Sequence, residues 1–120
     1  MKWMIALLLA AGASSAYAVD CKNAVSTPEI NECASIDQKK VEDKLNKVYQ
    51  RVIKSIGEAD TRKALVEAQR AWVKFREADC KAVYEQYKTG TIRSVMFIGC
   101  MQKHAETRIK DLEDFQSGGG

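Results

Sequence analysis

Apolar side chains recur at three- and four-residue steps along most of the chain, and glycine or proline interrupts this pattern at few positions. Such spacing places the apolar residues on one face of a helix. The first predicted helix opens at residues 26–29, where Ser, Thr, Pro and Glu form a capping box with proline in the first turn, and it ends at Gly57. The second predicted helix starts near Asp60 and stops around residues 88–90, and the third runs over about 91–115.

Short connections at 57–59 and 89–91 force neighbouring helices to be antiparallel. We therefore predict an all-α fold, a three-helix up-down-up bundle of long antiparallel helices. The apolar residues expected to face its interior are Ile30, Ala34, Val41, Leu45, Val48, Val52 and Ile56 in the first helix, Leu65, Ala68, Trp72, Phe75, Ala82 and Val83 in the second, and Val95, Ile98, Met101, Ala105, Ile109 and Leu112 in the third.

Residues 1–18 have the composition of a secretory signal peptide that is removed by cleavage near Ala18. Lys2 precedes an apolar run, and small residues end in Ala16-Tyr17-Ala18. The run is shorter than the ~20 residues of a membrane span, and no later segment is long enough, so we expect a periplasmic or secreted protein with no membrane span. Residues 19–116 then form a single domain, and residues 117–120 are expected to be a disordered tail.

The charge balance argues against nucleic-acid binding. The 120 residues include 19 Lys and Arg and 16 Asp and Glu, for a net charge of +3. Removal of residues 1–18 takes away one lysine and no acid, which leaves +2. Basic and acidic residues interleave, so the chain has no basic stripe of the kind that binds nucleic acid. A chain of this length also has no room for a large multi-domain enzyme.

An even number of cysteines in a short exported chain indicates disulfides. Cys80 and Cys100 are each ten positions from Gly90, so they face each other across an antiparallel hairpin. Cys21 precedes the first helix and Cys33 lies in its second turn, so a lead-in that folds back joins them. We therefore predict Cys21–Cys33 and Cys80–Cys100 as staples of the bundle. The alternative is that Cys33 reaches Cys80 or Cys100, if all four lie at the same end.

The sequence contains few candidate residues for a metal site or a catalytic site. His104 lies four residues after Cys100, so a soft-metal site is conceivable, but an oxidised cysteine supplies no thiolate, and we interpret His104 as a surface histidine. The sequence has no G-x-S-x-G turn, no C-x-x-C and no second histidine. Asp79 and Glu106 are able to approach across helices, but such pairs are common by chance on an acidic helical surface. We therefore expect a protein that is not an enzyme, with no metal ligand and no cofactor.

The densest block of unusual residues is 69–80. Trp72 has core spacing, which favours packing over binding. Arg76 and Asp79 are three positions apart on one helix face and are expected to pair. The aliphatic stem of Arg70 is expected to lie over the bundle.

This block resembles the LprI-like periplasmic lysozyme inhibitor family, in particular through A-Q-R-A-W-x-x-F-R at 68–76 followed by Cys80. The resemblance covers essentially all of the mature chain, and it departs from the usual pattern at Ile30, where Met is common, and at 89–91, where Gly-Gly-Ser is common. It implies an all-helical secreted domain that, in some relatives, inhibits lysozyme. The matching residues that we interpret as structural are Asn31, Leu45, Asn46, Tyr49, Gln69, Arg70, Trp72, Phe75, Arg76 and Arg108.

The favoured function is therefore a binding protein that inhibits c-type lysozyme by occluding its active-site cleft. That cleft works through two carboxylates, so a loop with cations and hydroxyl groups is complementary to it. The candidate loop is the tip made by Lys88, Thr89, Gly90, Thr91 and Arg93, although the same residues also fit a plain helix stop. The alternative function is an envelope structural or interaction module that binds a different wall enzyme or envelope protein.

Overall fold

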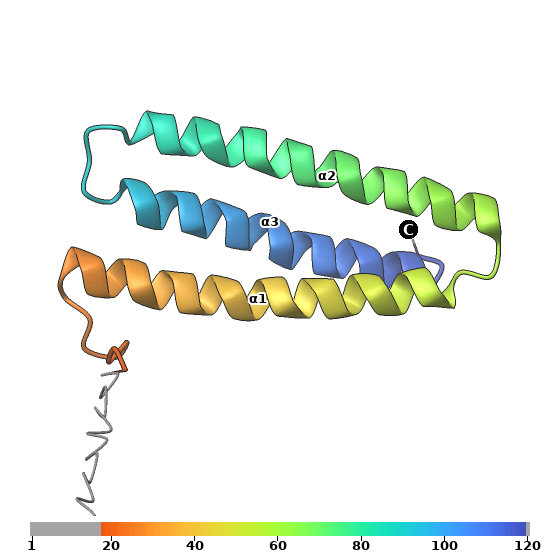
Figure 1. The fold of residues 1–120 in the computed structure, drawn as a ribbon, viewed down its shortest axis with the longest axis horizontal. Coiled ribbons are helices and arrows are strands. Elements are labelled where there is room, and N and C mark those ends of the chain that lie inside the picture. The colour runs from red at the N-terminus through yellow and green to blue at the C-terminus, as the bar shows by residue number, and fades with distance from the viewer. Residues whose placement is uncertain (1–17, 120) are drawn as a thin grey trace, which may run out of the picture.

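The computed structural model describes residues 18–119, which form three helices and no strand. These are α1 (Thr27–Ser55), α2 (Ala59–Gln86) and α3 (Arg93–Gln116). They run up, down and up, so the predicted helical fold is confirmed (Figure 1). Apart from Ala18, the predicted signal peptide lies outside the described residues. Within those residues, no helix has the length and apolarity to cross a membrane.

The helix ends follow from local chemistry. Ser26 Oγ accepts a hydrogen bond from the Glu29 amide at 3.3 Å, and the Glu29 carboxylate accepts one from the Ser26 amide at 3.3 Å, which is the predicted capping box. α2 begins at Ala59 with Glu58 as its N-cap, so Asp60 lies inside the first turn rather than at the cap. An acid there still stabilises the helix, because it faces the positive end of the helix dipole.

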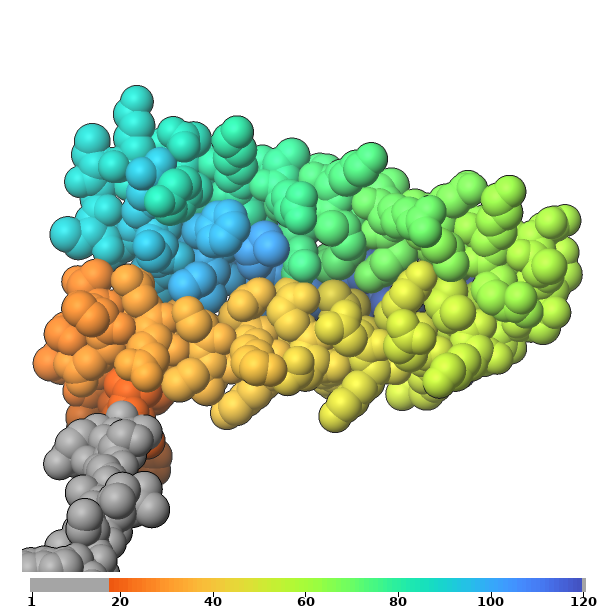
Figure 2. Space-filling view, viewed as in Figure 1, coloured from red at the N-terminus to blue at the C-terminus, as the bar shows by residue number. Residues whose placement is uncertain are grey.

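α3 forms the centre of the molecule. It packs against both α1 and α2, whereas α1 and α2 make few direct contacts with each other. Figure 1 shows α3 between the other two helices, and in Figure 2 atoms of α3 are visible between α1 and α2. Because α2 has one main neighbour, only a narrow strip of its surface is covered.

The apolar core occupies one half of the bundle, towards the α1–α2 turn and the C-terminus of α3. The helix stripes predicted from the sequence supply it. Its buried members are Leu45, Val48, Val52, Leu65, Ala105, Ile109 and Leu112.

Several residues expected in the core are exposed instead. Phe75 is 59% exposed and Ile30 is 40% exposed, and Ala68 and Ala82 also face solvent. Their spacing is helical, but no helix among residues 18–119 covers that flank of α2 or the start of α1.

Two disulfides hold the opposite half of the bundle. They join Cys21 to Cys33 and Cys80 to Cys100, each with a Cα–Cα distance of 5.6 Å. These are the pairings expected from the sequence. Both bridges lie at the same end of the molecule, and each nevertheless joins local partners.

The residues after α3, at the start of the predicted tail, form a helix cap. The Gly118 amide donates to the Phe115 carbonyl at 3.2 Å, and the Gly119 amide donates to the Asp114 carbonyl at 2.9 Å. This is a Schellman motif, and Gly118 has the positive φ of 79° that the motif requires. Gly120, the last residue of the predicted tail, lies outside the described residues.

Candidate functional site

The tip of the α2–α3 hairpin, residues 87–92, is the most exposed connection between helices. Lys88 and the following residues to Ile92 face solvent. The Gly90 amide donates to the Tyr87 carbonyl at 2.9 Å, which closes a tight turn. The connection is longer than the predicted 89–91, because α2 ends at Gln86 and α3 begins only at Arg93.

Arg93 clamps this tip to the end of α2. Its Nε donates to the Tyr84 carbonyl at 3.0 Å, and its Nη2 lies 3.1 Å from the Glu85 carboxylate. Its guanidinium also lies 3.5 Å from the centroid of the Tyr84 ring. Arg93 is therefore occupied in holding the tip, and Lys88 is the cation that the tip presents to solvent.

Two further contacts brace the hairpin below the tip. The rings of Tyr84 and Phe97 meet edge to face at a centroid distance of 5.8 Å. Further along, the Cys80–Cys100 disulfide joins the same two helices. The tip is thus fixed at three levels by contacts between α2 and α3.

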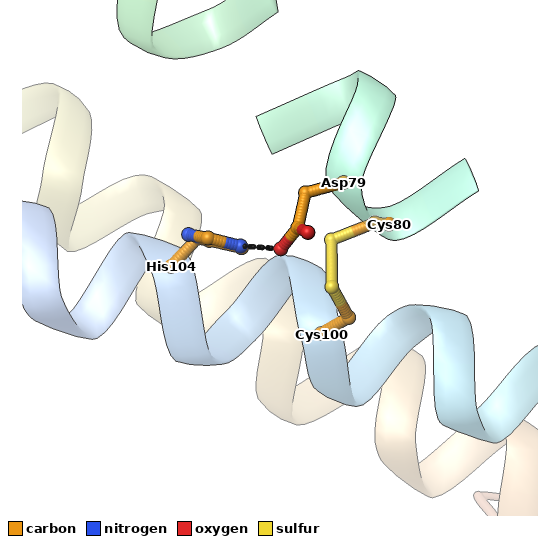
Figure 3. Close-up of side chains that lie close together, drawn as sticks. All are labelled: Asp79, Cys80, Cys100 and His104. Carbon is orange, nitrogen blue, oxygen red and sulfur yellow. Dashed lines mark hydrogen bonds and ion pairs between the residues drawn. A yellow bond between two sulfur atoms is a disulfide. The ribbon is translucent and has the colours of Figure 1, made fainter. Parts of the chain in front are cut away.

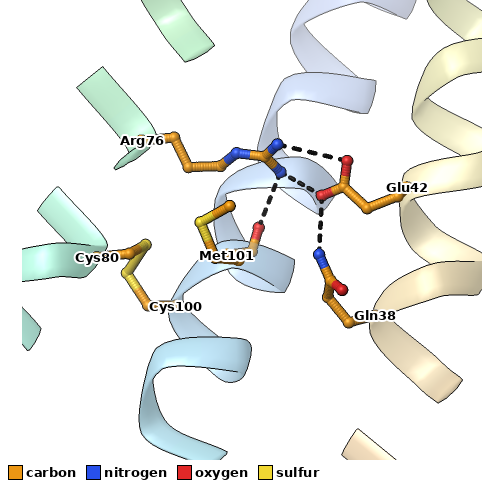
Figure 4. Close-up of polar contacts among 6 residues, drawn as sticks. All are labelled: Gln38, Glu42, Arg76, Cys80, Cys100 and Met101. Carbon is orange, nitrogen blue, oxygen red and sulfur yellow. Dashed lines mark hydrogen bonds and ion pairs between the residues drawn. A yellow bond between two sulfur atoms is a disulfide. The ribbon is translucent and has the colours of Figure 1, made fainter. Parts of the chain in front are cut away.

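Arg76 joins all three helices (Figure 4). Arg76 lies on α2, and its guanidinium forms a bidentate ion pair with Glu42 of α1. It also donates a hydrogen bond to the Met101 carbonyl of α3 at 3.4 Å. Gln38 donates to the same carboxylate at 3.2 Å. Arg76 is only 8% exposed, so this is a nearly buried charge with a charged partner.

The predicted pairing of Arg76 with Asp79 is therefore wrong. Three positions correspond to about 300° around a helix, so the two side chains diverge by about 60°. Arg76 points to α1, whereas Asp79 points to α3.

Trp72 and Arg108 form a second cross-helix contact next to the core. Arg108 Nε donates to Gln69 Oε1 at 2.8 Å, and its guanidinium lies 5.9 Å from the Trp72 ring centroid. The Arg76 guanidinium lies 4.6 Å from the same centroid. Burial lowers the pKa of Arg108, while Asp111 and Tyr49 act in the opposite direction. The 69–76 block thus connects α2 to both other helices.

Asp79 and His104 lie beside the α2–α3 disulfide (Figure 3), and Phe75 packs against His104 to complete a three-residue cluster. His104 Nε2 and Asp79 Oδ2 are 2.5 Å apart, and the Phe75 ring meets the His104 ring edge-on at 5.5 Å. The cluster borders a surface groove of about 590 Å³. Asp79 pairs with His104 rather than with Glu106, which accepts a hydrogen bond from Gln102 at 3.1 Å.

The other residues that match the family pattern differ in burial. Leu45 is in the core, Tyr49 packs against it, and Asn31 is half-buried. Asn46 and Arg70 are exposed, and Phe75 is 59% exposed although its ring contacts His104, so core packing does not account for these three.

Sequence reasoning missed Glu42 and Gln38, the partners of Arg76. Both lie on α1 four positions apart, and Glu42 directly follows Val41, which packs against the core. In the sequence, the only indication of this ion pair is an acidic residue, Glu42, directly beside a residue that faces the core.

Together these features define an all-helical domain whose long antiparallel helices are held by two disulfides and end in a clamped hairpin tip. The sequence profile of the family "Lysozyme inhibitor LprI" matches residues 20–112, and the chain belongs to this family. It is similar to an uncharacterized protein of Rhizobium meliloti (strain 1021), with 29% identity over 107 residues that cover 79% of this chain and 77% of the relative. No solved structure matches the chain with significance.

Proposed function

We propose that this protein is an exported inhibitor of c-type lysozyme and that it occludes the active-site cleft with the α2–α3 tip. The observation that carries the proposal is the clamped and exposed tip in a member of a lysozyme inhibitor family. Within the tip, Lys88, Thr89 and Thr91 contact the enzyme, Gly90 allows the close turn, and Arg93 holds the loop in shape.

A rigid tip favours tight binding because little conformational freedom is lost on association. The Arg93 clamp and the Cys80–Cys100 bridge both restrict residues 87–92 before binding. Ile92, which is 47% exposed, adds apolar area to the same surface.

The charge at the tip, rather than the net charge of the protein, supports the tip as the surface that binds lysozyme. The mature chain is nearly neutral, so long-range attraction to a basic lysozyme is weak. The ammonium group of Lys88 faces solvent and complements the two carboxylates of the cleft.

The test is a titration of the oxidised mature protein against c-type lysozyme while wall lysis is followed, with g-type lysozyme as the control enzyme. Saturating inhibition near equimolar ratio supports the proposal. Absence of both inhibition and binding overturns it and leaves an envelope module with a different partner.

Reversing the charge of Lys88 tests whether the tip is the surface that binds lysozyme. Lys88→Glu should weaken binding by about tenfold or more, since a close charge pair across an interface is worth about 1.5 kcal/mol or more. Lys63→Glu, at another exposed lysine near the other end of α2, is the matched control and should leave affinity unchanged. Equal affinities of the two variants would show that the tip is not the contact surface.

A further inference from the structure

Four potential metal ligands meet between α2 and α3. Asp79 and Cys80 are neighbours on α2, and Cys100 and His104 are one turn apart on α3. A carboxylate oxygen, a ring nitrogen and the two sulfurs all lie within 4.8 Å of one another (Figure 3). In the oxidised protein the sulfurs are bonded to each other and offer no thiolate, so this form has only two of the four ligands.

We propose that reduction of the Cys80–Cys100 disulfide creates a tetrahedral site for a zinc-like divalent cation. Two cysteine thiolates, one histidine and one carboxylate are a ligand set of the kind that zinc accepts. Disulfide formation and metal binding then exclude each other, because both use the same pair of sulfurs.

The reaction balances with a dithiol as the reductant. The dithiol gives two electrons and two protons to the disulfide, becomes a disulfide itself and leaves two cysteine thiols on the protein. The cation then binds both sulfurs as thiolates, and their two protons pass to water. His104 binds through Nε2, the atom that now contacts Asp79.

Small side-chain movements suffice to form the site. Zinc bonds of about 2.0–2.3 Å place tetrahedral ligand atoms roughly 3.3–3.8 Å apart. The separations in the cluster do not exceed 4.8 Å, and the 2.5 Å contact between Asp79 and His104 opens to admit the ion.

The surroundings give access and orientation. The Asp79 side chain is 46% exposed and borders the groove of about 590 Å³, so an ion can enter from solvent. Phe75 lies edge-on to the His104 ring and packs against one side of it.

The second disulfide provides a matched control. Within residues 18–119, Cys21 and Cys33 belong to no comparable group of ligands. The test protein is Cys21→Ser with Cys33→Ser, which keeps only the α2–α3 pair, and the control is Cys80→Ser with Cys100→Ser. Both are reduced with dithiothreitol, freed of it under nitrogen and titrated with Co²⁺ as the spectroscopic probe.

The reduced test protein should bind one Co²⁺ with thiolate-to-cobalt charge-transfer bands and the strong visible bands of tetrahedral cobalt, which Zn²⁺ then abolishes. The control and the oxidised test protein should show neither set of bands. His104→Ala in the test protein should weaken binding by at least about tenfold, since changes beyond the direct ligands already cost 10- to 100-fold.

Circular dichroism provides a second readout of metal binding, which applies if reduction loosens the fold. Zn²⁺ should then raise the helix content or Tm of the reduced test protein and not that of the control, because a ligand that binds the folded state stabilises it. Charge-transfer bands of equal strength in the control, their absence from the reduced test protein, or an unchanged affinity in His104→Ala would each overturn the proposal.

Discussion

At the residue scale, Arg76 is the side chain of α2 that contacts both other helices, through Glu42 of α1 and the Met101 carbonyl of α3. It is 8% exposed and pairs with Glu42, whose side chain is 23% exposed. Removing one partner of a buried pair leaves the other charge without compensation, whereas replacing both can be nearly neutral.

Arg76→Met should lower the free energy of unfolding by about 2–3 kcal/mol, somewhat less than for a fully buried pair because Glu42 retains some hydration. Adding Glu42→Leu should recover part of this loss. Urea unfolding of the two single variants and the double variant measures the coupling, and strictly additive losses would show that the two side chains do not interact.

The exposed pair Lys39–Asp43 is the control for that cycle. Its side chains are 76% and 55% exposed, and the residues are four apart on α1. Lys39→Met should therefore change the stability by no more than about 0.5 kcal/mol.

Side-chain partners were the part of the structure least accessible from the sequence. Spacing along one helix suggested Arg76 with Asp79, yet these residues pair with Glu42 and His104 on other helices. Spacing reports only which residues share a face of their own helix. Which helix covers that face depends on the packing of all three.

At the element scale, helix limits were predictable wherever the sequence contains a local capping interaction. The Ser26 capping box lies where expected. The connection is longer than predicted, since α2 ends at Gln86 and α3 begins at Arg93, whose side chain folds back onto Tyr84 and Glu85. Four of the five predicted tip residues, 88–91, lie in the connection, whereas Arg93 is the first residue of α3 and its clamp is a tertiary contact without a local pattern.

Ser26→Ala should destabilise the protein by about 1 kcal/mol, because it removes the hydroxyl that accepts from the Glu29 amide. Ser35→Ala, an exposed change inside α1, is the control and should be neutral or slightly stabilising. Thermal unfolding by circular dichroism compares the two variants, and an equal Tm for both would mean that the cap adds no stability.

The Cys80–Cys100 disulfide should stabilise the tip more than it stabilises the helices. Cys80→Ala with Cys100→Ala should reduce stability by about 3 kcal/mol, as expected for a loop closed over a separation of 20 residues. Amide exchange should accelerate most at residues 87–92. Unchanged exchange there would mean that the Arg93 clamp alone holds the tip.

At the scale of the whole molecule, the two halves of the bundle are stabilised by different means. The half near the α1–α2 turn contains the apolar core, whereas the half with the tip is held by two disulfides and the Arg76–Glu42 pair. The apolar stripes predicted the first half well, because burial follows periodicity where three helices meet. They failed for Phe75 and Ile30, because α1 and α2 hardly touch.

Core truncation should confirm where the apolar stabilisation lies. Leu112→Ala should cost about 3 kcal/mol, because Leu112 is 1% exposed and its loss leaves a cavity. Ile30→Ala, at a 40% exposed position, should cost less than about 1 kcal/mol. Urea unfolding gives both values, and similar losses would contradict a core confined to one half.

Reduction of both disulfides should loosen the tip half of the bundle and leave the core half folded. Under a metal chelator, reduction removes the staples of the tip half but leaves the contacts among 45–52, Leu65 and 105–112 intact. Amides near the start of α1 and on both sides of the tip should then exchange fast, while those in the core half remain protected, since local opening follows local contact density. Hydrogen exchange measured by mass spectrometry on the oxidised and reduced protein tests this, and a uniform rise over all three helices would show that the halves unfold as one unit. A selective rise would mean that the apolar core keeps the helices associated while the disulfides determine the shape of the end proposed to bind lysozyme.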